Sequence, residues 1–250
     1  MPDEPIPAAT LVIFREQPAG PPELLMVERA KAMVFAGGAL VFPGGRIDPD
    51  DELLAERIGG DLADAAARIA AIRETIEETG LGPALAPAPL AAALAQLRQE
   101  LEEGAPFSAL LDNQGLTLEL DALTPFARWC PTFKEARRFD TLFYLAEAPA
   151  DAELPHAAEA EAIRTLWASA AEVLEQAESG RARIIFPTRR NLERLAQFGS
   201  FEAAVAHALA HPVVPITPYP EERADGPWLC IPEGLGYPVT AERWTSVMRG

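Results

Sequence analysis

Three glutamates within five residues, Glu74, Glu77 and Glu78, form the most chemically suggestive stretch of this sequence. In a helix, successive residues rotate by about 100°, so the three carboxylates would share one face. Their mutual repulsion costs about 0.2–0.5 kcal/mol per pair. Gly80, a typical helix-ending residue, places them in the last turn, where the helix dipole also disfavours anions. Because a divalent cation with oxygen ligands would relieve both penalties, we predict a metal site on this face.

The helix that must carry these glutamates is predicted over residues 62–79. Asp61 is suited to cap its first turn, and its apolar residues recur with helical spacing. Ile69, Ile72 and Ile76 fall opposite the carboxylates. The pattern therefore predicts one face packed on a core and one face open to a ligand.

Two glycines supply the second part of the predicted site. Residues 8–15 and 23–28 have the composition of paired strands joined by a turn, and a further β run over 35–42 leads to Gly44 and Gly45. Glycines permit the backbone to approach a ligand closely. A polar loop is expected to begin at Pro49.

The remaining elements alternate between helix and strand. We expect an Ala/Pro linker over 81–89, helices at 90–103, 107–112, 169–179 and 188–210 (with a break near 198–200), strands at 116–132, 137–146 and 160–167, and a hairpin near 228–231. No internal repeats are present.

Composition limits the function classes. Across 250 residues, 49% are apolar, 24% are charged and the net charge is −17, which argues against a duplex nucleic-acid partner. Cys130 and Cys230 have no metal-ligand or disulfide spacing, so we expect reduced thiols. No signal peptide or membrane span is recognisable, and we expect no membrane partner and a cytoplasmic location.

The glycine pair, the acidic stretch after it and Arg73-Glu-Thr-Ile-Glu-Glu-Thr-Gly-Leu81 together resemble the signature of the Nudix hydrolases, Gly-x5-Glu-x7-Arg-Glu-U-x-Glu-Glu-x-Gly-U, where U is bulky and apolar. There are three departures. Thr75 replaces an apolar residue, and Asp51 or Glu52 stands where the first glutamate belongs. Twenty-one residues, 52–72, occupy a spacing of seven, so an insertion splits the motif.

The resemblance implies an α/β fold, a Nudix-type α/β/α sandwich with a mixed sheet. We expect a single domain over 1–250, with an insertion inside the motif at about 52–65, a helical insertion at about 84–112 and a helical C-terminal extension at about 188–250.

The interrupted motif is similar to a branch that includes coenzyme A diphosphatases. Leu24, Leu25, Arg29, Gly38 and residues 42–45 fit the spacing of that branch's lead-in motif. Ala30 and Val34 depart from it, although Lys31 lies close by. The run from 137 to 141 and the helical tail also resemble this branch.

The resemblance also implies roles for individual residues. Glu74, Glu77 and Glu78, with the Gly45 carbonyl, would hold Mg²⁺ or Mn²⁺, and Arg73 would orient the glutamates. Glu77 is the expected general base, with Glu74 and Arg73 in the catalytic set; Glu159 or Glu161 from a later loop is the alternative base. The expected partners of the substrate phosphates are Arg29, Arg46, Arg137 and Arg138.

The implied activity is metal-dependent hydrolysis of a pyrophosphate bond in a nucleoside diphosphate linked to another moiety. Coenzyme A or acyl-coenzyme A is the leading substrate, and NADH or ADP-ribose is second. A catalytically silent ligand sensor with the same fold and a helical interaction module over 90–210 are the alternatives from other classes. Monomer and homodimer both stay open.

Overall fold

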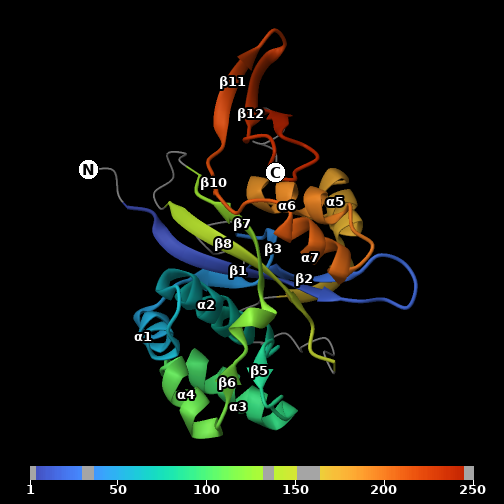
Figure 1. Cartoon of the computed structure of the whole chain (residues 1–250). Coiled ribbons are helices and arrows are strands. Elements are labelled where there is room, and N and C mark those ends of the chain that lie inside the picture. Colours follow the sequence, from blue (N-terminus) through green and yellow to red (C-terminus); the bar gives the residue numbers. More distant parts are fainter. Residues whose placement is uncertain (1–3, 30–36, 132–137, 151–163, 245–250) are drawn as a thin grey trace.

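The computed structural model describes residues 4–29, 37–131, 138–150 and 164–244. A large mixed sheet lies at its centre, with helices on both faces (Figure 1). Its strands are β1 (Ile6–Arg15), β2 (Glu23–Glu28), β3 (Leu40–Val41), β4 (Gly44–Arg46), β7 (Thr124–Trp129), β8 (Phe139–Glu147), β9 (Arg164–Ser169) and β10 (Pro215–Ile216). Their order is β10-β7-β8-β1-β2-β3, with β4 paired to β1 and β9 paired to β2.

Strand β1 organises this sheet. One edge pairs in parallel with β8 along nearly its whole length. The other edge is shared: Ala8, Ala9 and Thr10 pair with β4, whereas Phe14 and Arg15 pair with β2. The predicted hairpin of the first two strands is therefore confirmed. The sharing also sets the glycine pair of β4 against Ala9 and Thr10, in the middle of β1.

Helices form a layer on each face of the sheet, around two separate apolar cores. One layer contains α1 (Pro49–Ile58), α2 (Leu62–Thr79), α3 (Ala91–Glu102) and α4 (Phe107–Gln114); the other contains α5 (Ala170–Glu178), α6 (Phe186–Leu195) and α7 (Phe201–Leu209). Alternate side chains of β1 divide between the cores: Leu11 and Ile13 face α2, while Val12 and Phe14 face the other layer. The predicted α/β/α sandwich is confirmed.

The segment after Pro49 corrects the sequence prediction, because it forms helix α1 and not a polar loop. Proline at the first helical position and an Asp48–Asp51 capping box start the helix. The insertion into the motif is therefore an ordered helix that packs on α2.

The predicted linker over 81–89 contains a short strand. Strand β5 (Leu85–Ala86) pairs with β6 (Thr117–Leu118), so the two strands enclose α3 and α4. The β structure predicted over 116–132 is interrupted by a 3₁₀ turn at Leu120–Ala122 before β7 begins. The helical insertion is thus closed at its base by a strand pair.

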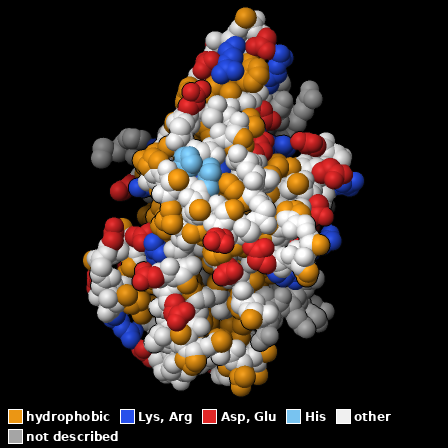
Figure 2. Space-filling view, turned by 45° about the vertical axis from the view of Figure 1, so that its right-hand side comes forward, with side chains coloured by type: hydrophobic (Ala, Val, Ile, Leu, Met, Phe, Trp, Pro, Cys, Tyr) orange, Lys and Arg blue, Asp and Glu red, His pale blue; other side chains and the backbone are white. Residues whose placement is uncertain are grey.

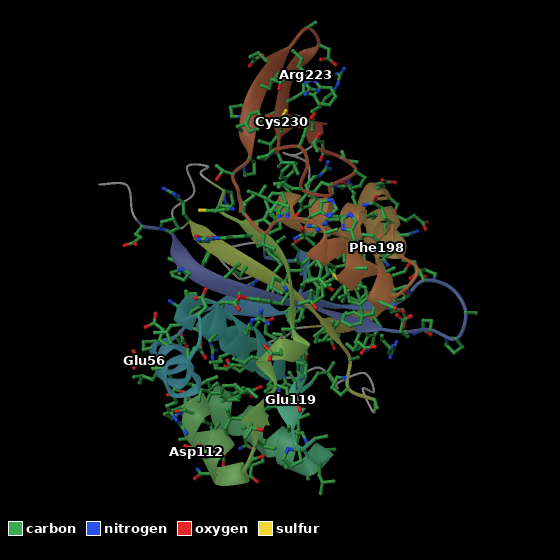
Figure 3. The ribbon with its side chains drawn as sticks, viewed as in Figure 1. Glu56, Asp112, Glu119, Phe198, Arg223 and Cys230 are labelled. Carbon is green, nitrogen blue, oxygen red and sulfur yellow. The ribbon has the colours of Figure 1, made fainter. Side chains whose placement is uncertain are left out.

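The C-terminal extension contributes most of α6 and all of α7 to the second helical layer and then projects. After α7, β10 joins the sheet beside β7; then β11 (Tyr219–Arg223), β12 (Gly226–Cys230) and β13 (Ala241–Arg243) form a small sheet at the top of Figure 1. Arg223 and Cys230 lie on this projection (Figure 3). The break between α6 and α7 and the C-terminal hairpin agree with the sequence prediction.

The surface reflects the composition. On the face shown in Figure 2, acidic side chains are scattered over many elements, with fewer basic ones between them. No helix in the described ranges is long and apolar enough to cross a membrane. Cys130 and Cys230 are both free thiols, as expected.

Candidate active site

Helix α2 has well-defined ends. The Asp61 side chain accepts hydrogen bonds from the amides of Ala63 and Asp64, at 3.2 and 3.3 Å. Gly80 ends the helix in a left-handed conformation, φ 72°, and its amide donates to the Ile76 carbonyl. Both caps are the ones that the sequence predicts, so the last turn with its glutamates is fixed in place.

The face of α2 opposite the glutamates is completely buried. Ile69, Ile72 and Ile76 have no exposed surface and pack in the core beneath the sheet. Thr75, the residue that departs from the apolar pattern of the motif, is equally buried. Its hydroxyl donates to the Ala71 carbonyl at 2.7 Å, which satisfies the polar group and explains why the core accepts it.

The two glycines of β4 lie directly against α2. A Cβ on Gly45 would stand 2.3 Å from the Glu74 carboxylate, closer than atoms can approach. A Cβ on Gly44 would stand 2.4 Å from the Ala9 carbonyl oxygen. The Gly44 amide donates to the Glu78 carboxylate at 3.1 Å. The glycine pair therefore meets the glutamate face.

Arg73 connects the parts of the site. Its guanidinium donates from Nε to Asp51 Oδ1 at 3.0 Å, and from Nη2 to Asp51 Oδ2 and to the Arg46 carbonyl at 2.9 Å each. Nη1 donates to Glu74 at 3.0 Å and to Glu77 at 2.8 Å. Burial opposes the charge, but the surrounding carboxylates outweigh it and raise the pKa of Arg73. The predicted contact with Glu77 is present, within a larger network.

The structure distinguishes the two candidates for the first acidic position. Asp51 is fully buried and pairs with Arg73, while Glu52 is exposed on the outer side of α1. Burial raises the pKa of Asp51, and the bonds from Arg73 and from the Asp48 amide oppose that rise. Asp51 also stands at the signature spacing after Gly45, so the split motif is continuous in space.

Glu74 and Glu78 are held in a poorly hydrated environment. Burial, together with the charge of Glu77, raises the pKa of Glu74 to about 7. Burial and the nearby Glu74 raise the pKa of Glu78 to about 8, although the Gly44 amide and the charge of Arg29 oppose the rise. Two carboxyl groups that resist ionisation side by side are the expected condition of a site made for a cation.

These residues fit a divalent cation by their chemistry. Oxygen donors from Glu74 and Glu78 lie beside the Gly44–Gly45 backbone, and the Glu74 carboxylate stands where a side chain on Gly45 would be. No cluster of three or more His, Cys, Asp or Glu side chains with metal-ligand geometry occurs in the part of the chain that the structure describes. Instead, the Arg73 guanidinium donates hydrogen bonds to Glu74 and Glu77, so two of the three glutamates are paired with a positively charged side chain.

The predicted phosphate-binding arginines are only partly assembled. Arg29 is near enough to influence Glu78, and its Nε is buried without a partner among the described residues. Arg138 likewise has a buried Nε without such a partner. The Arg46 side chain is exposed, and by strand alternation it points away from the face of Gly45. Arg137, Glu159 and Glu161 lie outside the described residues.

Two residues of the site were absent from the sequence prediction. Asp48 lies 3.8 Å from Arg73 and caps α1. Arg98 of α3 donates to the Glu77 carbonyl at 3.0 Å. The Pro49-Asp-Asp start was a usable signal for Asp48, since proline often follows a capping residue. No local signal in the sequence identifies Arg98.

Comparisons with known proteins agree with this geometry. No family model matches the chain. A crystal structure of a Nudix hydrolase from Alicyclobacillus acidocaldarius is 32% identical, covers 82% of this chain and 97% of its own, and superimposes with a TM-score of 0.73. The acyl-coenzyme A diphosphatase NUDT19 of Gallus gallus is 29% identical over 71% of this chain. The match spans only 62% of that relative's length.

The sandwich fold and the glycine pair set against a glutamate-bearing helix agree with the Nudix-type fold and motif that the sequence resembles. The similarity to the Alicyclobacillus enzyme extends over almost that whole structure, and the chain therefore belongs to the Nudix hydrolase family. Enzymes of this family generally use divalent metal ions.

Proposed function

We propose that this chain hydrolyses a pyrophosphate bond in a nucleoside diphosphate linked to another moiety, with coenzyme A or acyl-coenzyme A as the leading substrate. The observation that carries the proposal is the meeting of Glu74 and Glu78 with the Gly44–Gly45 backbone, with Arg73 joined to Asp51 behind them. An arrangement of this kind concentrates negative oxygen donors at one point.

In this proposal, Glu74 and Glu78 hold the divalent cation, Mg²⁺ or Mn²⁺, together with Glu77 and the Gly45 carbonyl. The bound cation would neutralise phosphate charge and acidify a water molecule. Arg73 keeps Glu74 and Glu77 at a fixed separation through Nη1, and Asp51 prevents the guanidinium from turning away. The network therefore preorganises the carboxylates before substrate arrives.

Glu77 is our candidate for the general base. Its side chain is 28% exposed, compared with 17% for Glu74, and is open enough to meet a water molecule. As the water oxygen attacks phosphorus and the bond to the leaving phosphate breaks, Glu77 would accept the proton. Arg29, Arg137 and Arg138 are proposed to contact the substrate phosphates, with Arg29 the best placed because its charge reaches Glu78. Arg46 is left out of this set because its side chain points away from the face of Gly45.

The coenzyme A preference rests on the similarity to the chicken acyl-coenzyme A diphosphatase and on the lead-in residues Leu24, Leu25, Arg29 and Gly38. The test is a substrate panel of coenzyme A, acyl-coenzyme A, NADH and ADP-ribose with Mg²⁺ or Mn²⁺, followed by mass analysis of the products. Fastest turnover is expected for the coenzyme A compounds. If NADH were cleaved rapidly and the coenzyme A compounds were not cleaved at all, the protein would instead be a dinucleotide pyrophosphatase.

A silent ligand sensor is the alternative from another class, and the complete glutamate trio argues against it. Glu77→Gln and Glu78→Gln should abolish hydrolysis and keep the fold, as judged by circular dichroism. Glu52→Gln, on the exposed side of the neighbouring helix, is the matched control and should keep full activity. Full activity in the first two variants would refute the assigned roles.

We also propose that residues 1–250 form one domain, because both insertions pack on α2 or on each other. Size-exclusion chromatography with light scattering would decide between monomer and homodimer.

A further inference from the structure

The helical insertion touches the end of the helix that carries the glutamates. Leu94 of α3 lies against Gly82, where a Cβ would stand 2.9 Å from the leucine Cδ1. Leu97 and Leu101, which follow along the same side of α3, are buried in the core shared with α2. The insertion is therefore fixed beside the last turn of α2 by apolar packing.

One turn after Leu94, Arg98 contacts the backbone of the last turn of α2. Its Nε donates to the Glu77 carbonyl at 3.0 Å and to the Glu102 carboxylate at 2.9 Å. The Arg98 side chain is 16% exposed, whereas Glu102 is 44% exposed. A cation is thus held at the C-terminal end of α2, where the helix dipole is negative and three glutamates are close.

The Glu77 carbonyl is available to Arg98 because the helix ends at Gly80 and the chain then turns away. In a longer helix the Leu81 amide would bond to that carbonyl, but here it bonds to the Thr79 hydroxyl at 3.1 Å. The Gly80 amide bonds to Ile76 at 2.8 Å. Arg98 therefore replaces the missing backbone donor of the residue whose side chain we propose as the base.

Helix α4, which belongs to the same insertion as α3, is bonded to α1. The Asp50 carboxylate of α1 accepts from the Ser108 amide and hydroxyl of α4, at 2.9 and 2.7 Å. Arg57 pairs with Asp112 at 2.8 Å at the outer end of the same two helices, where Glu56 and Asp112 are labelled in Figure 3. The two insertions thus pack together around α2.

From these contacts, and resting on the function proposed above, we infer that Arg98 is a positioning residue of the active site. Through the Glu77 carbonyl it fixes the last turn of α2, and so the direction in which Glu77 and Glu78 present their carboxylates. Asp51 fixes the same helix one turn earlier, through Arg73. Helix α1, through Asp51, and the helical insertion, through Arg98, therefore brace the catalytic helix at two points.

The test compares Arg98→Ala and Arg98→Lys with the wild-type enzyme on whichever panel substrate it cleaves fastest. Misplaced carboxylates should lower kcat by about 10- to 100-fold in Arg98→Ala, with KM changed by about twofold or less. Arg98→Lys, which keeps a cationic donor, should recover part of kcat. Hydrogen–deuterium exchange should be faster over 76–81 in the metal-free Arg98→Ala variant, a readout that is independent of turnover.

Glu102→Ala is the matched control, since it removes the exposed partner of Arg98 and leaves the Glu77 contact. It should keep wild-type kcat and exchange. Unchanged kcat and exchange in Arg98→Ala, with an active wild type, would overturn the inference and leave the proposed function standing. A raised KM with unchanged kcat would also overturn it, since Arg98 would then bind substrate directly. An inactive wild type across the whole panel would instead contradict the proposed function.

Discussion

At the scale of single residues, the candidate site depends on a close approach between backbone and carboxylate. The Glu74 carboxylate occupies the position that a Cβ of residue 45 would take. Glycine is required there because of contact, since no left-handed conformation is involved at Gly45. In the proposed function the same residue would also offer its carbonyl to the cation.

Gly45→Ala should therefore displace Glu74 and lower kcat by about 100-fold, the effect expected of a misplacement near 1 Å. The overall fold should survive, because the clash involves one side chain that can move. Steady-state kinetics and circular dichroism measure the two effects. Gly199→Ala is the control, since nothing lies within 4 Å of its added carbon. Equal activity in both variants would show that Glu74 needs no fixed position.

Asp51 gives a second prediction at the residue scale, which concerns the stability of the fold. Asp51→Asn removes the buried counter-charge of Arg73 and should destabilise the protein by about 3 kcal/mol. This is the lower end for a broken buried pair, because Arg73 keeps Glu74 and Glu77. Urea unfolding measures the loss. Glu52→Gln, one residue away and exposed, should change stability by less than about 0.5 kcal/mol. Equal losses would mean that the buried pair contributes nothing.

At the scale of elements, the sequence predicted those helices whose ends and buried face are determined by residues within or next to the helix itself. Helix α2 has its caps and its isoleucine spacing in its own sequence, and the break between α6 and α7 follows from Gly199-Ser200. Helix α1 was missed because Pro49-Asp-Asp is equally typical of a turn. The contact that distinguishes Asp51 from Glu52 is with Arg73, twenty-two residues later. Arg98 shows the same limit, since only the packing of α3 brings it to Glu77.

The C-terminal extension is attached to the sheet by a buried polar network that no periodicity predicts. The Tyr237 hydroxyl donates to Asn191 Oδ1 at 2.7 Å, and the Trp129 indole donates to Asn191 at 3.2 Å and to the Tyr237 oxygen at 3.1 Å. The rings of Trp129 and Tyr237 meet edge to face at 5.8 Å. One residue from each of β7, α6 and the tail therefore joins three segments.

Tyr237→Phe should lower stability by about 1–2 kcal/mol, because it deletes two neutral buried hydrogen bonds, one donated to Asn191 and one accepted from Trp129, and leaves Trp129 its bond to Asn191. The aromatic packing is kept, so the fold should remain. Thermal or urea unfolding measures the change, and Tyr219→Phe, on the exposed strand β11, is the control. Hydrolysis should be unaffected, since the network lies in the helical layer opposite α2. A loss of activity would tie the extension to the site.

At the scale of the whole molecule, the active site concentrates negative charge within a chain that is already strongly acidic. The net charge of −17 is spread over the surface, but Glu74 and Glu78 are held where water screens them poorly. An apolar core lies on each face of the sheet, and the burial in these cores offsets the free-energy cost of burying the two carboxylates. The molecule without its cation should therefore carry a strain that depends on pH.

The metal-free protein should be less stable at about pH 8.5 than at about pH 6. The folded pKa values of Glu74 and Glu78 lie above the ordinary glutamate value, so the folded state keeps protons that the unfolded chain has lost. Stability then falls as pH rises from about 6 to about 8.5, by about 2–4 kcal/mol in total. Saturating Mg²⁺ or Mn²⁺, which binds the ionised forms, should flatten this slope, as should Glu78→Gln in part. Urea unfolding at both pH values measures it; identical slopes with and without cation would contradict the proposed metal site.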